Sequence, residues 1–400
     1  MLGMIARSAS PALSQLADVG LRAALASGGS GLRSMAQFAI ANKGIEAGAG
    51  GRSSASGVTA TVFGGYGFVG SYVVNQLGKR GSQVVVPSRT TDIKTQHIRQ
   101  MGDLGQIIIL NEFDIKDDDM VRKAIARSNV VINMVGQRTE TMNFKYEDVH
   151  EAWPKRLAQI VKDAGHVERF IHFSDIGADA KATSRRMRTK AAGDAAVREL
   201  VPSATIFKPA PIVGIEDYFY NNVIYAVSYS LIAPLYDNGA ARVQPAYIND
   251  VAEAVTNALM MKDSVGKDYY LAGPEVLTWR EVYDLIIKTL NLKRDDTIPI
   301  PAWMAKLLLA PKDWARRSLP TLPMSNWQYS SDYVDEMTAG KIAPHGALGL
   351  KDLGITPTKV TEGLPIEPVR HFRVGGYAWG DMAHVADKVP EAIRKYYNLK

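Results

Sequence analysis

The glycine-rich segment at residues 61–70 constrains the fold of this chain more than any other feature. It runs from a short strand-like stretch through glycines at positions 64, 67 and 70 into a helical pattern. This spacing permits a sharp turn and lets backbone N–H groups approach a diphosphate at the positive end of the helix. The segment predicts a dinucleotide cradle rather than an ordinary glycine-rich loop. Its expected binding residues are Gly64, Tyr66, Gly67, Phe68, Val69 and Gly70.

Short β-rich runs alternate with helical runs from residue 58 to residue 209. Strands are expected at residues 58–63, 83–87, 106–110, 130–134, 169–173 and 205–208, and helices at 68–80, 117–127, 154–164 and 184–200. This alternation is typical of an α/β fold with a doubly wound parallel sheet. Ligands of such folds bind at the carboxyl ends of the strands, so the loops that follow the strands are candidate binding loops.

The pattern loosens after residue 210. A further strand is expected at 245–249, then a helix to Met261 capped by Asn249 or Asp250, and a helix that starts from a capping box at residues 278–281 and ends near Leu290. We expect a leader at 1–57, a nucleotide-binding domain with a smaller mixed C-terminal part at 58–290, and a proline-rich, irregular extension at 291–400 that leans on something else.

Composition excludes several classes of function. The chain has 400 residues with 46% apolar content, enough to bury a large core, and it has no cysteine, so disulfides, thiolate metal sites and cysteine nucleophiles are absent. Its seven histidines show no metal-ligand spacing, so no metal is expected. Half of the net charge of +6 lies in residues 1–57, so the basic balance does not indicate a nucleic-acid partner.

Residues 1–57 resemble an organellar transit peptide. They are rich in alanine, serine and glycine, they hold five basic residues against two acidic ones, and Leu13, Leu16, Leu21 and Leu25 fall roughly on one helical face. We favour a mitochondrial address, with a chloroplast address or a plain disordered leader as alternatives.

The uncharged run at 218–236 is interrupted by asparagine, serine and proline, so we expect a buried wall beside the cofactor rather than a membrane span.

The loops after the strands supply the remaining candidate residues. Ser88 and Arg89 follow the second strand with no acid nearby, which favours a ribose 2′-phosphate and hence NADP(H), unless Arg89 is a solvated loop residue. Asp114 can accept from the adenine amine while Ile115 packs on its ring, although a helix cap explains Asp114 nearly as well. The run Asn133-Met134-Val135-Gly136 follows the fourth strand, and the backbone at Val135 and Gly136 is expected to pass close to the cofactor's ribose or nicotinamide side.

Together these motifs resemble the extended and atypical short-chain dehydrogenase/reductase superfamily, which implies a Rossmann-type fold. Its members have a serine or threonine after the fifth strand and a Tyr-x-x-x-Lys motif in the next helix, in which the tyrosine is the general acid/base. Here Ser174 and Lys190 match, but the tyrosine position is Arg186. A guanidinium cannot exchange protons near neutral pH, so we expect no catalytic residue here. We expect Ser174 and Lys190 to hold the cofactor's ribose; they could also be structural remnants.

A closer resemblance is to the nucleotide-binding accessory subunits of respiratory complex I, the alpha-subcomplex subunit 9 family. It rests on residues 63–70, 133–136, 188–194 and 208–214, the last of which includes Pro209 as a further cofactor-binding candidate. The resemblance implies a peripheral subunit on the matrix side of the mitochondrial inner membrane, bound to other complex I subunits near the quinone-reducing region, with one NADPH as a structural cofactor. Many members keep a tyrosine at the position of Arg186.

The extension has features of a docking segment. Trp303, Leu307, Leu308, Leu309, Trp314 and Trp327 are interspersed with basic residues at 306, 312, 316 and 317, which suits a membrane surface, a neighbouring subunit, or packing on the chain's own domain. We therefore predict a non-catalytic, NADPH-binding accessory subunit. The alternatives are an NADPH-dependent reductase or epimerase that uses Lys190 or a water in place of tyrosine, and a module that senses the NADPH/NADP ratio.

Overall fold

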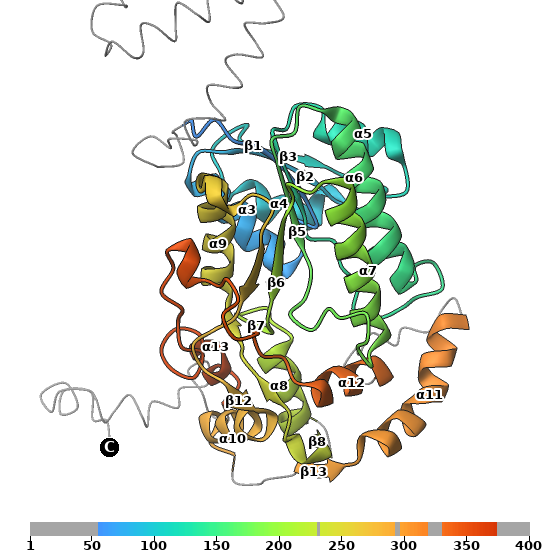
Figure 1. Cartoon of the computed structure of the whole chain (residues 1–400). Helices are drawn as coiled ribbons and strands as arrows, with labels where there is room; N and C mark the ends of the chain where they lie inside the picture. The colour runs from blue at the N-terminus through green and yellow to red at the C-terminus, as the bar shows by residue number, and fades with distance from the viewer. Residues whose placement is uncertain (1–54, 230–232, 293–296, 319–329, 374–400) are drawn as a thin grey trace, which may run out of the picture.

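The structure, a computed structural model, describes residues 55–229, 233–292, 297–318 and 330–373 (Figure 1). The predicted leader at 1–57 falls almost entirely outside these residues, and so does Trp327. The predicted nucleotide-binding region at 58–290 is described apart from residues 230–232.

A seven-stranded parallel sheet forms the centre of the molecule, in the order β11-β6-β5-β4-β1-β2-β3. The strands are β1 (Thr59–Phe63), β2 (Gln83–Pro87), β3 (Ile107–Leu110), β4 (Val130–Asn133), β5 (Arg169–Phe173), β6 (Thr205–Pro209) and β11 (Asp268–Leu271). The order reverses between β1 and β4, as in doubly wound sheets that bind dinucleotides. The fold class and the first six strands are confirmed, whereas β11 was not predicted.

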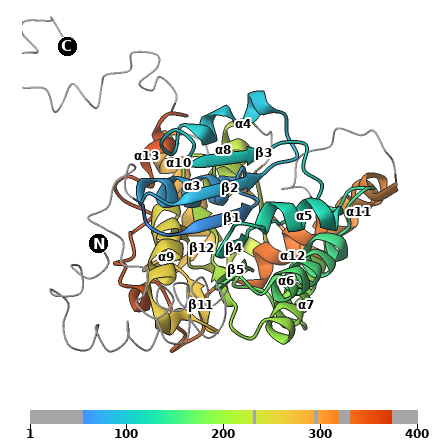
Figure 2. The same ribbon diagram turned by 90° about the horizontal axis from the view of Figure 1, so that it is seen from above.

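Helices cover both faces of this sheet (Figures 1 and 2). Helices α3 (Phe68–Lys79), α4 (Asp92–Arg99) and α9 (Ile248–Met260) pack on one face, and α5 (Asp118–Ile125), α6 (Trp153–Ala164) and α7 (Arg185–Leu200) on the other. Val73, Val74 and Leu77 of α3 are fully buried in the first core, and Trp153 and Leu157 of α6 in the second. The predicted helices are confirmed within a residue or two, and α4 is an addition.

Helix α9 begins earlier than the sequence suggested. Its N-cap is Tyr247, so the prediction that Asn249 or Asp250 caps it is wrong. The Asp250 carboxylate instead accepts hydrogen bonds from the backbone N–H (2.7 Å) and hydroxyl (3.0 Å) of Thr358. The strand expected at 245–249 is only β10 (Ala246–Tyr247), because the chain turns directly into α9. The capping box at Thr278 is confirmed, and it starts α10 (Trp279–Leu290).

A smaller mixed part lies below the sheet in Figure 1. It contains α8 (Phe219–Tyr229), β8 (Ala233–Tyr236) paired with β13 (Thr297–Ile300), β7 (Ile212–Val213) paired with β10, β9 (Arg242–Val243) paired with β12 (Leu277–Thr278), and helices α10, α11 (Ala302–Ser318), α12 (Ser331–Ala339) and α13 (Glu367–Arg370). Short π- or 3-10-helical turns occur at Asp148–Ala152, Asp237–Gly239, Lys262–Ser264 and Lys351–Leu353. A separate apolar core joins α8, α10 and α12.

The described part of the extension is more regular than the sequence suggested. It forms helices α11 to α13, and Leu350, Leu353 and Ile355 join the core between the sheet and helices α3 and α9. We call α11 and α12 together the C-terminal arm. In the described residues no helix has the length and apolar character needed to cross a membrane. No group of three or more potential metal ligands occurs within those same residues.

Candidate functional site

The glycine segment forms a tight turn at the point where the strand order of the sheet reverses. Gly64 follows β1 with φ +82°, and a Cβ built there would lie 2.9 Å from the carbonyl carbon of Met134, which follows β4. A Cβ at Gly70 would lie 2.2 Å from the carbonyl oxygen of Gly64. Both positions therefore require glycine, one for the turn and one for close packing of helix on strand.

The N-terminus of α3 is open to an anion. Its N-cap is Gly67, which has no capping side chain, and the first turn contains no acidic residue. The first N–H groups of a helix have no intrahelical partner and carry the positive end of the dipole. Because Gly67, Phe68, Val69 and Gly70 also line a cavity, this end of α3 fits the pyrophosphate of a dinucleotide.

The cavity lies at the carboxyl ends of the central strands and has a volume of about 580 Å³. Ten of the predicted site residues line it: Gly64, Gly67, Phe68, Val69, Gly70, Val135, Gly136, Ser174, Lys190 and Pro209. A Cβ at Gly136 would meet nothing within 4 Å, so this loop faces open space. Of the uncharged run expected to form a buried wall, Tyr218 and Phe219 line the cavity, but Tyr218 is 48% exposed.

The other predicted residues lie outside this cavity, on the side of β2 and β3. Tyr66 is 37% exposed, with its ring centre 5.6 Å from that of His97. The Asp114 carboxylate accepts the backbone N–H of Lys116 at 2.9 Å, and Ile115 packs against the core on the α6 side. In such folds an adenine half would extend over these strand ends, beyond the cavity.

Ser88 and Arg89 form the loop after β2. Ser88 is buried, and its hydroxyl shares a 2.8 Å hydrogen bond with the hydroxyl of Thr90. Arg89 is exposed, with its guanidinium carbon 5.8 Å from the ring centre of Phe144. Two hydroxyls and a guanidinium at one strand end have the chemistry needed to bind a phosphate.

The hydroxyl of Ser174 is already committed as a donor. It donates to Asp194 Oδ2 at 2.7 Å, and Asp194 Oδ1 lies 3.3 Å from His172 Nε2. The amide nitrogen of Asn133 is 3.1 Å from His172 Nδ1, so Nδ1 accepts and the ring proton sits on Nε2, facing Asp194. Ser174 can therefore accept a hydrogen bond from a ligand, but in this arrangement it has no proton left to donate.

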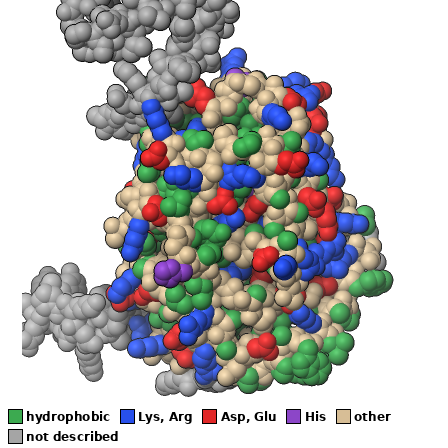
Figure 3. Space-filling view, viewed as in Figure 1, with side chains coloured by type: hydrophobic (Ala, Val, Ile, Leu, Met, Phe, Trp, Pro, Cys, Tyr) green, Lys and Arg blue, Asp and Glu red, His purple; other side chains and the backbone are tan. Residues whose placement is uncertain are grey.

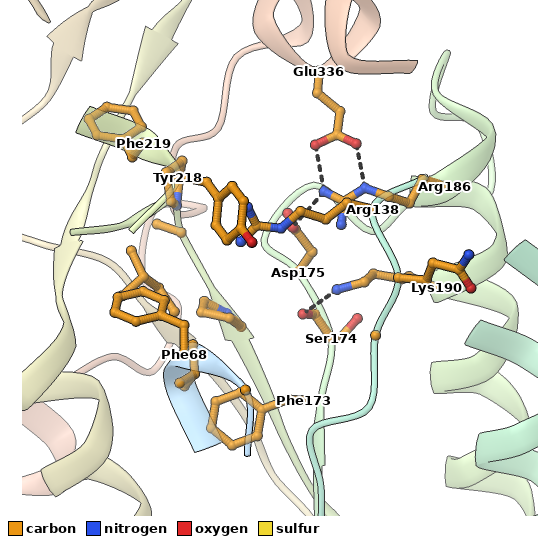
Figure 4. A pocket seen from close by; sticks show the side chains of 18 of the residues that line it. Phe68, Arg138, Phe173, Ser174, Asp175, Arg186, Lys190, Tyr218, Phe219 and Glu336 are labelled. Carbon is orange, nitrogen blue, oxygen red and sulfur yellow. Dashed lines mark hydrogen bonds and ion pairs between the residues drawn. The ribbon is translucent and has the colours of Figure 1, made fainter. Parts of the chain in front are cut away.

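Lys190 lies one helical turn after Arg186 on α7. Its ammonium donates to the backbone oxygen of Ser174 at 2.9 Å and faces the cavity (Figure 4). Burial lowers the pKa of Lys190 to about 8, with Asp175 opposing the shift and the charges of Arg186 and Lys341 adding to it. The two remaining N–H donors suit ribose hydroxyls.

Arg186 is held by a bidentate ion pair from the C-terminal arm. Its Nε and a terminal nitrogen donate to the two carboxylate oxygens of Glu336, each at 2.6 Å (Figure 4). Lys341 bridges the cluster, at 2.9 Å from Glu336 and 3.0 Å from Asp175. Burial alone would lower the pKa of Arg186, but Glu336 and Asp175 raise it above its ordinary value. Arg186 is therefore a fixed cation and no proton donor.

Arg138 crosses the cavity beside this cluster. Its guanidinium carbon lies 3.3 Å from the ring centre of Tyr218, a cation–π contact (Figure 4). Burial and the nearby charge of Arg186 lower the pKa of Arg138 to about 10.

Sequence reasoning missed several residues of this site. Asp194 could have been found, because it lies four residues after Lys190 on the same helical face. Asp175 could have been found in the same way, because it directly follows Ser174 in the sequence. No sequence signal points to Glu336 or Lys341, because they come from the extension and are separated from Arg186 by about 150 residues.

The fold and the site define a nucleotide-binding protein of the short-chain dehydrogenase type. The family model described as the NAD dependent epimerase/dehydratase family matches residues 60–273. Among solved structures, the triphenylmethane reductase of Citrobacter sp. complexed with NADP(H) is similar with a TM-score of 0.59 at 17% identity, covering 78% of this chain and 99% of that one. The UDP-glucuronic acid 4-epimerase of Bacillus cereus gives a TM-score of 0.52 at 16% identity, covering 70% and 99%. At such identities these two show the fold alone.

Curated relatives are much closer. The chain is 38% identical to NADH dehydrogenase (ubiquinone) 1 alpha subcomplex subunit 9, mitochondrial, of Arabidopsis thaliana, covering 88% of this chain and 87% of that one. It is 40% identical to the Mus musculus protein of the same name, covering 84% and 85%. The NADH-ubiquinone oxidoreductase 40 kDa subunit of Neurospora crassa is 30% identical, covering 88% of each. The chain belongs to the family of NADH dehydrogenase (ubiquinone) 1 alpha subcomplex subunit 9.

Proposed function

We propose that this protein is a non-catalytic accessory subunit of mitochondrial respiratory complex I that holds one NADPH as a structural cofactor. The observation that carries the proposal is the state of the two catalytic positions. Arg186 stands where the superfamily has its tyrosine and is paired with Glu336, and the hydroxyl of Ser174 is donated to Asp194. The cradle is kept, the general acid/base is replaced by a paired cation, and the serine hydroxyl is already donated, which supports binding without turnover.

The proposed mitochondrial assembly is supported by the relatives, whose names describe them as mitochondrial subunits of NADH dehydrogenase. We propose the same address for this chain, with a transit peptide in residues 1–57 and a peripheral position on the matrix side of the inner membrane, near the quinone site. The test is a tagged chain isolated from gently solubilised mitochondria on a native gel. Comigration with complex I is expected; a free protein that oxidises NADPH with a substrate would overturn the proposal.

NADPH is favoured over NADH by the loop after β2. Arg89 is exposed beside the hydroxyls of Ser88 and Thr90, where a 2′-phosphate would be expected. The variant Arg89→Gln should weaken NADPH about tenfold and leave NADH affinity unchanged. The control is Lys162→Gln, an exposed lysine on α6. Equal loss for both nucleotides, or no loss, would remove Arg89 from the site.

Helix α11 offers a surface for the membrane and neighbouring subunits. Trp303, Leu307, Leu308 and Trp314 are each at least 66% exposed, and apolar side chains gather where α11 lies, at the lower right of Figure 3. The one acidic residue of α11, Asp313, is buried and accepts two hydrogen bonds from Ser331. An exposed apolar face with tryptophans and basic flanks suits the interfacial layer of a membrane.

One observation favours a second function. The pKa of Lys190 near 8 would let its ammonium act as a proton donor close to the ribose, as an atypical reductase or epimerase would require. Substrate-dependent oxidation of NADPH that disappears in Lys190→Met, with the nucleotide still bound, would establish that function instead.

A further inference from the structure

The arm helix α12 docks on the first turn of α7, the helix that carries Arg186 and Lys190. Ser184 is the N-cap of α7, but its side chain makes no cap hydrogen bond to the helix. The carboxylate of Asp332 takes over that role, accepting the backbone N–H of Arg185 at 3.0 Å and the hydroxyl of Ser184 at 3.4 Å. A carboxylate from a distant helix therefore satisfies the positive end of α7.

A second contact lies one turn further along α12, at the next residue of α7. Glu336 is four residues after Asp332, so the two carboxylates share a face of α12, and Glu336 receives both hydrogen bonds from Arg186. The side chains of Arg186 and Glu336 are only 10% and 5% exposed. A buried guanidinium that lost this carboxylate would be left with Asp175, 3.5 Å away, as its acidic partner in this cluster.

The same cluster reaches the residues expected to hold the ribose. Lys341 connects Glu336 to Asp175, Asp175 follows Ser174, and Lys190 donates to the Ser174 backbone oxygen. Tyr333, Glu336 and Met337 of α12 also line the cavity itself. Figure 4 shows this arrangement, with Glu336 above Arg186, and Lys190 and Ser174 below Arg186. The arm is thus one wall of the nucleotide site.

We propose that Asp332 and Glu336 are positioning residues for the nucleotide site, so that docking of α12 on α7 and binding of the nucleotide at Lys190 stabilise each other. The inference rests on the proposed nucleotide function. A nucleotide bound in the cavity would favour the docked arm, and an undocked arm would weaken the nucleotide. Linkage requires the two effects to be equal in size. Because α11 packs on α12, binding of the nucleotide would also affect the position of the exposed apolar face of α11.

The test compares two adjacent acidic residues of α12 in the full chain. Glu336→Gln keeps the shape and removes the charge facing Arg186. Asp335→Asn is the matched control, because Asp335 pairs with Lys306 of α11 rather than with α7. The measurements are the dissociation constant for NADPH, by nucleotide fluorescence, and amide hydrogen exchange of residues 331–339 with and without NADPH.

In the wild type, NADPH should slow exchange in residues 331–339. Glu336→Gln should speed exchange there without nucleotide and weaken NADPH about tenfold, whereas Asp335→Asn should stay within about twofold of the wild type. Arg89→Gln should weaken NADPH without changing exchange in the nucleotide-free arm. If Glu336→Gln does not fold, Asp332→Asn takes its place with the same expectations.

The outcomes separate the two proposals. If the wild type does not bind NADPH, the proposed function fails and the linkage fails with it. If NADPH binds but leaves exchange of the arm unchanged, or if Glu336→Gln loosens the arm without weakening NADPH, the linkage alone is overturned. Equal weakening by Asp335→Asn would also overturn it, because the effect would then belong to the arm in general rather than to its contact with α7.

Discussion

The hydroxyl of Ser174 donates to Oδ2 of Asp194 at 2.7 Å, and the other carboxylate oxygen, Oδ1, lies 3.3 Å from Nε2 of His172. One oxygen of this buried carboxylate is bonded to a serine at a strand end, and the other lies near a histidine on β5 (Arg169–Phe173) without a hydrogen bond to it. This arrangement ties α7 to the sheet at the level of the residues proposed to bind the cofactor. It also removes the proton with which a serine in this position could orient a carbonyl substrate.

Asp194→Asn should therefore destabilise the protein by about 1–3 kcal/mol. The asparagine could still accept from Ser174, but its amide group would lie where the carboxylate oxygen now faces His172 Nε2, so the favourable charge beside this buried ring would be lost. Urea unfolding measures the change. Asp163→Asn, an exposed residue at the end of α6, serves as the control and should be neutral within about 0.5 kcal/mol. A neutral result for Asp194→Asn would contradict the assigned network.

The cradle predicts different outcomes for two glycines that line the same cavity. Gly70→Ala would place a Cβ 2.2 Å from the Gly64 oxygen, so β1 and α3 must separate and nucleotide binding should be lost. Gly136→Ala meets no atom within 4 Å and should leave the melting temperature unchanged. Calorimetry and NADPH titration of both variants check this. Retained binding in Gly70→Ala would show that the cradle tolerates a side chain.

The fold could be predicted from the sequence as far as local signals reach. The β-rich runs gave six strands, and the glycine segment gave the cradle, because each depends on neighbouring residues. Helix α4 was missed because only Thr95 and Ile98 are buried, so its eight residues show little apolar periodicity. Strand β11 is four residues long at the sheet edge and follows the loosened part of the pattern.

The candidate site could be predicted only in part, for the same reason. The cradle, Ser174 and Lys190 are marked by spacing within short segments, and the structure brings them to one cavity. The partner of Arg186 could not be predicted, because Glu336 is an ordinary helix residue whose role depends on how the extension folds back. A long-range ion pair leaves no periodic trace in a single sequence.

Restoring the tyrosine of the superfamily should not create an enzyme. Arg186→Tyr leaves Glu336 buried with Lys341 as its remaining cation, so we expect a loss of about 3 kcal/mol in the free energy of unfolding. The double variant Arg186→Met/Glu336→Met removes both charges and should be clearly more stable than Arg186→Tyr. Urea unfolding ranks the three proteins. A stable, NADPH-oxidising Arg186→Tyr variant would show that this one substitution is what silences the site.

Lys190 gives a pH dependence with a definite sign. Burial lowers the pKa of Lys190 to about 8 from an ordinary value of 10.5, so between these values the unfolded chain binds a proton that the folded protein does not. Stability then rises with pH. Relative to Lys190→Met, the free energy of unfolding of the nucleotide-free wild type should increase by roughly 3 kcal/mol between pH 8 and pH 10.5. Parallel curves for the two proteins would show that Lys190 titrates as an ordinary lysine.

The exposed face of α11 can be tested apart from the nucleotide site. The variant Trp303→Ser/Leu307→Ser removes two side chains that are 68% and 67% exposed, so folding should be unaffected. Burying side chains of this size contributes about 1.5–3 kcal/mol each, so binding to vesicles that contain anionic lipid should fall at least about tenfold in a sedimentation assay. The control is Ile93→Ser/Leu104→Ser, which removes two still more exposed apolar residues, at 80% and 102%, away from α11. If both variants bind vesicles equally, or the wild type binds none, the face of α11 contacts another protein subunit rather than lipid.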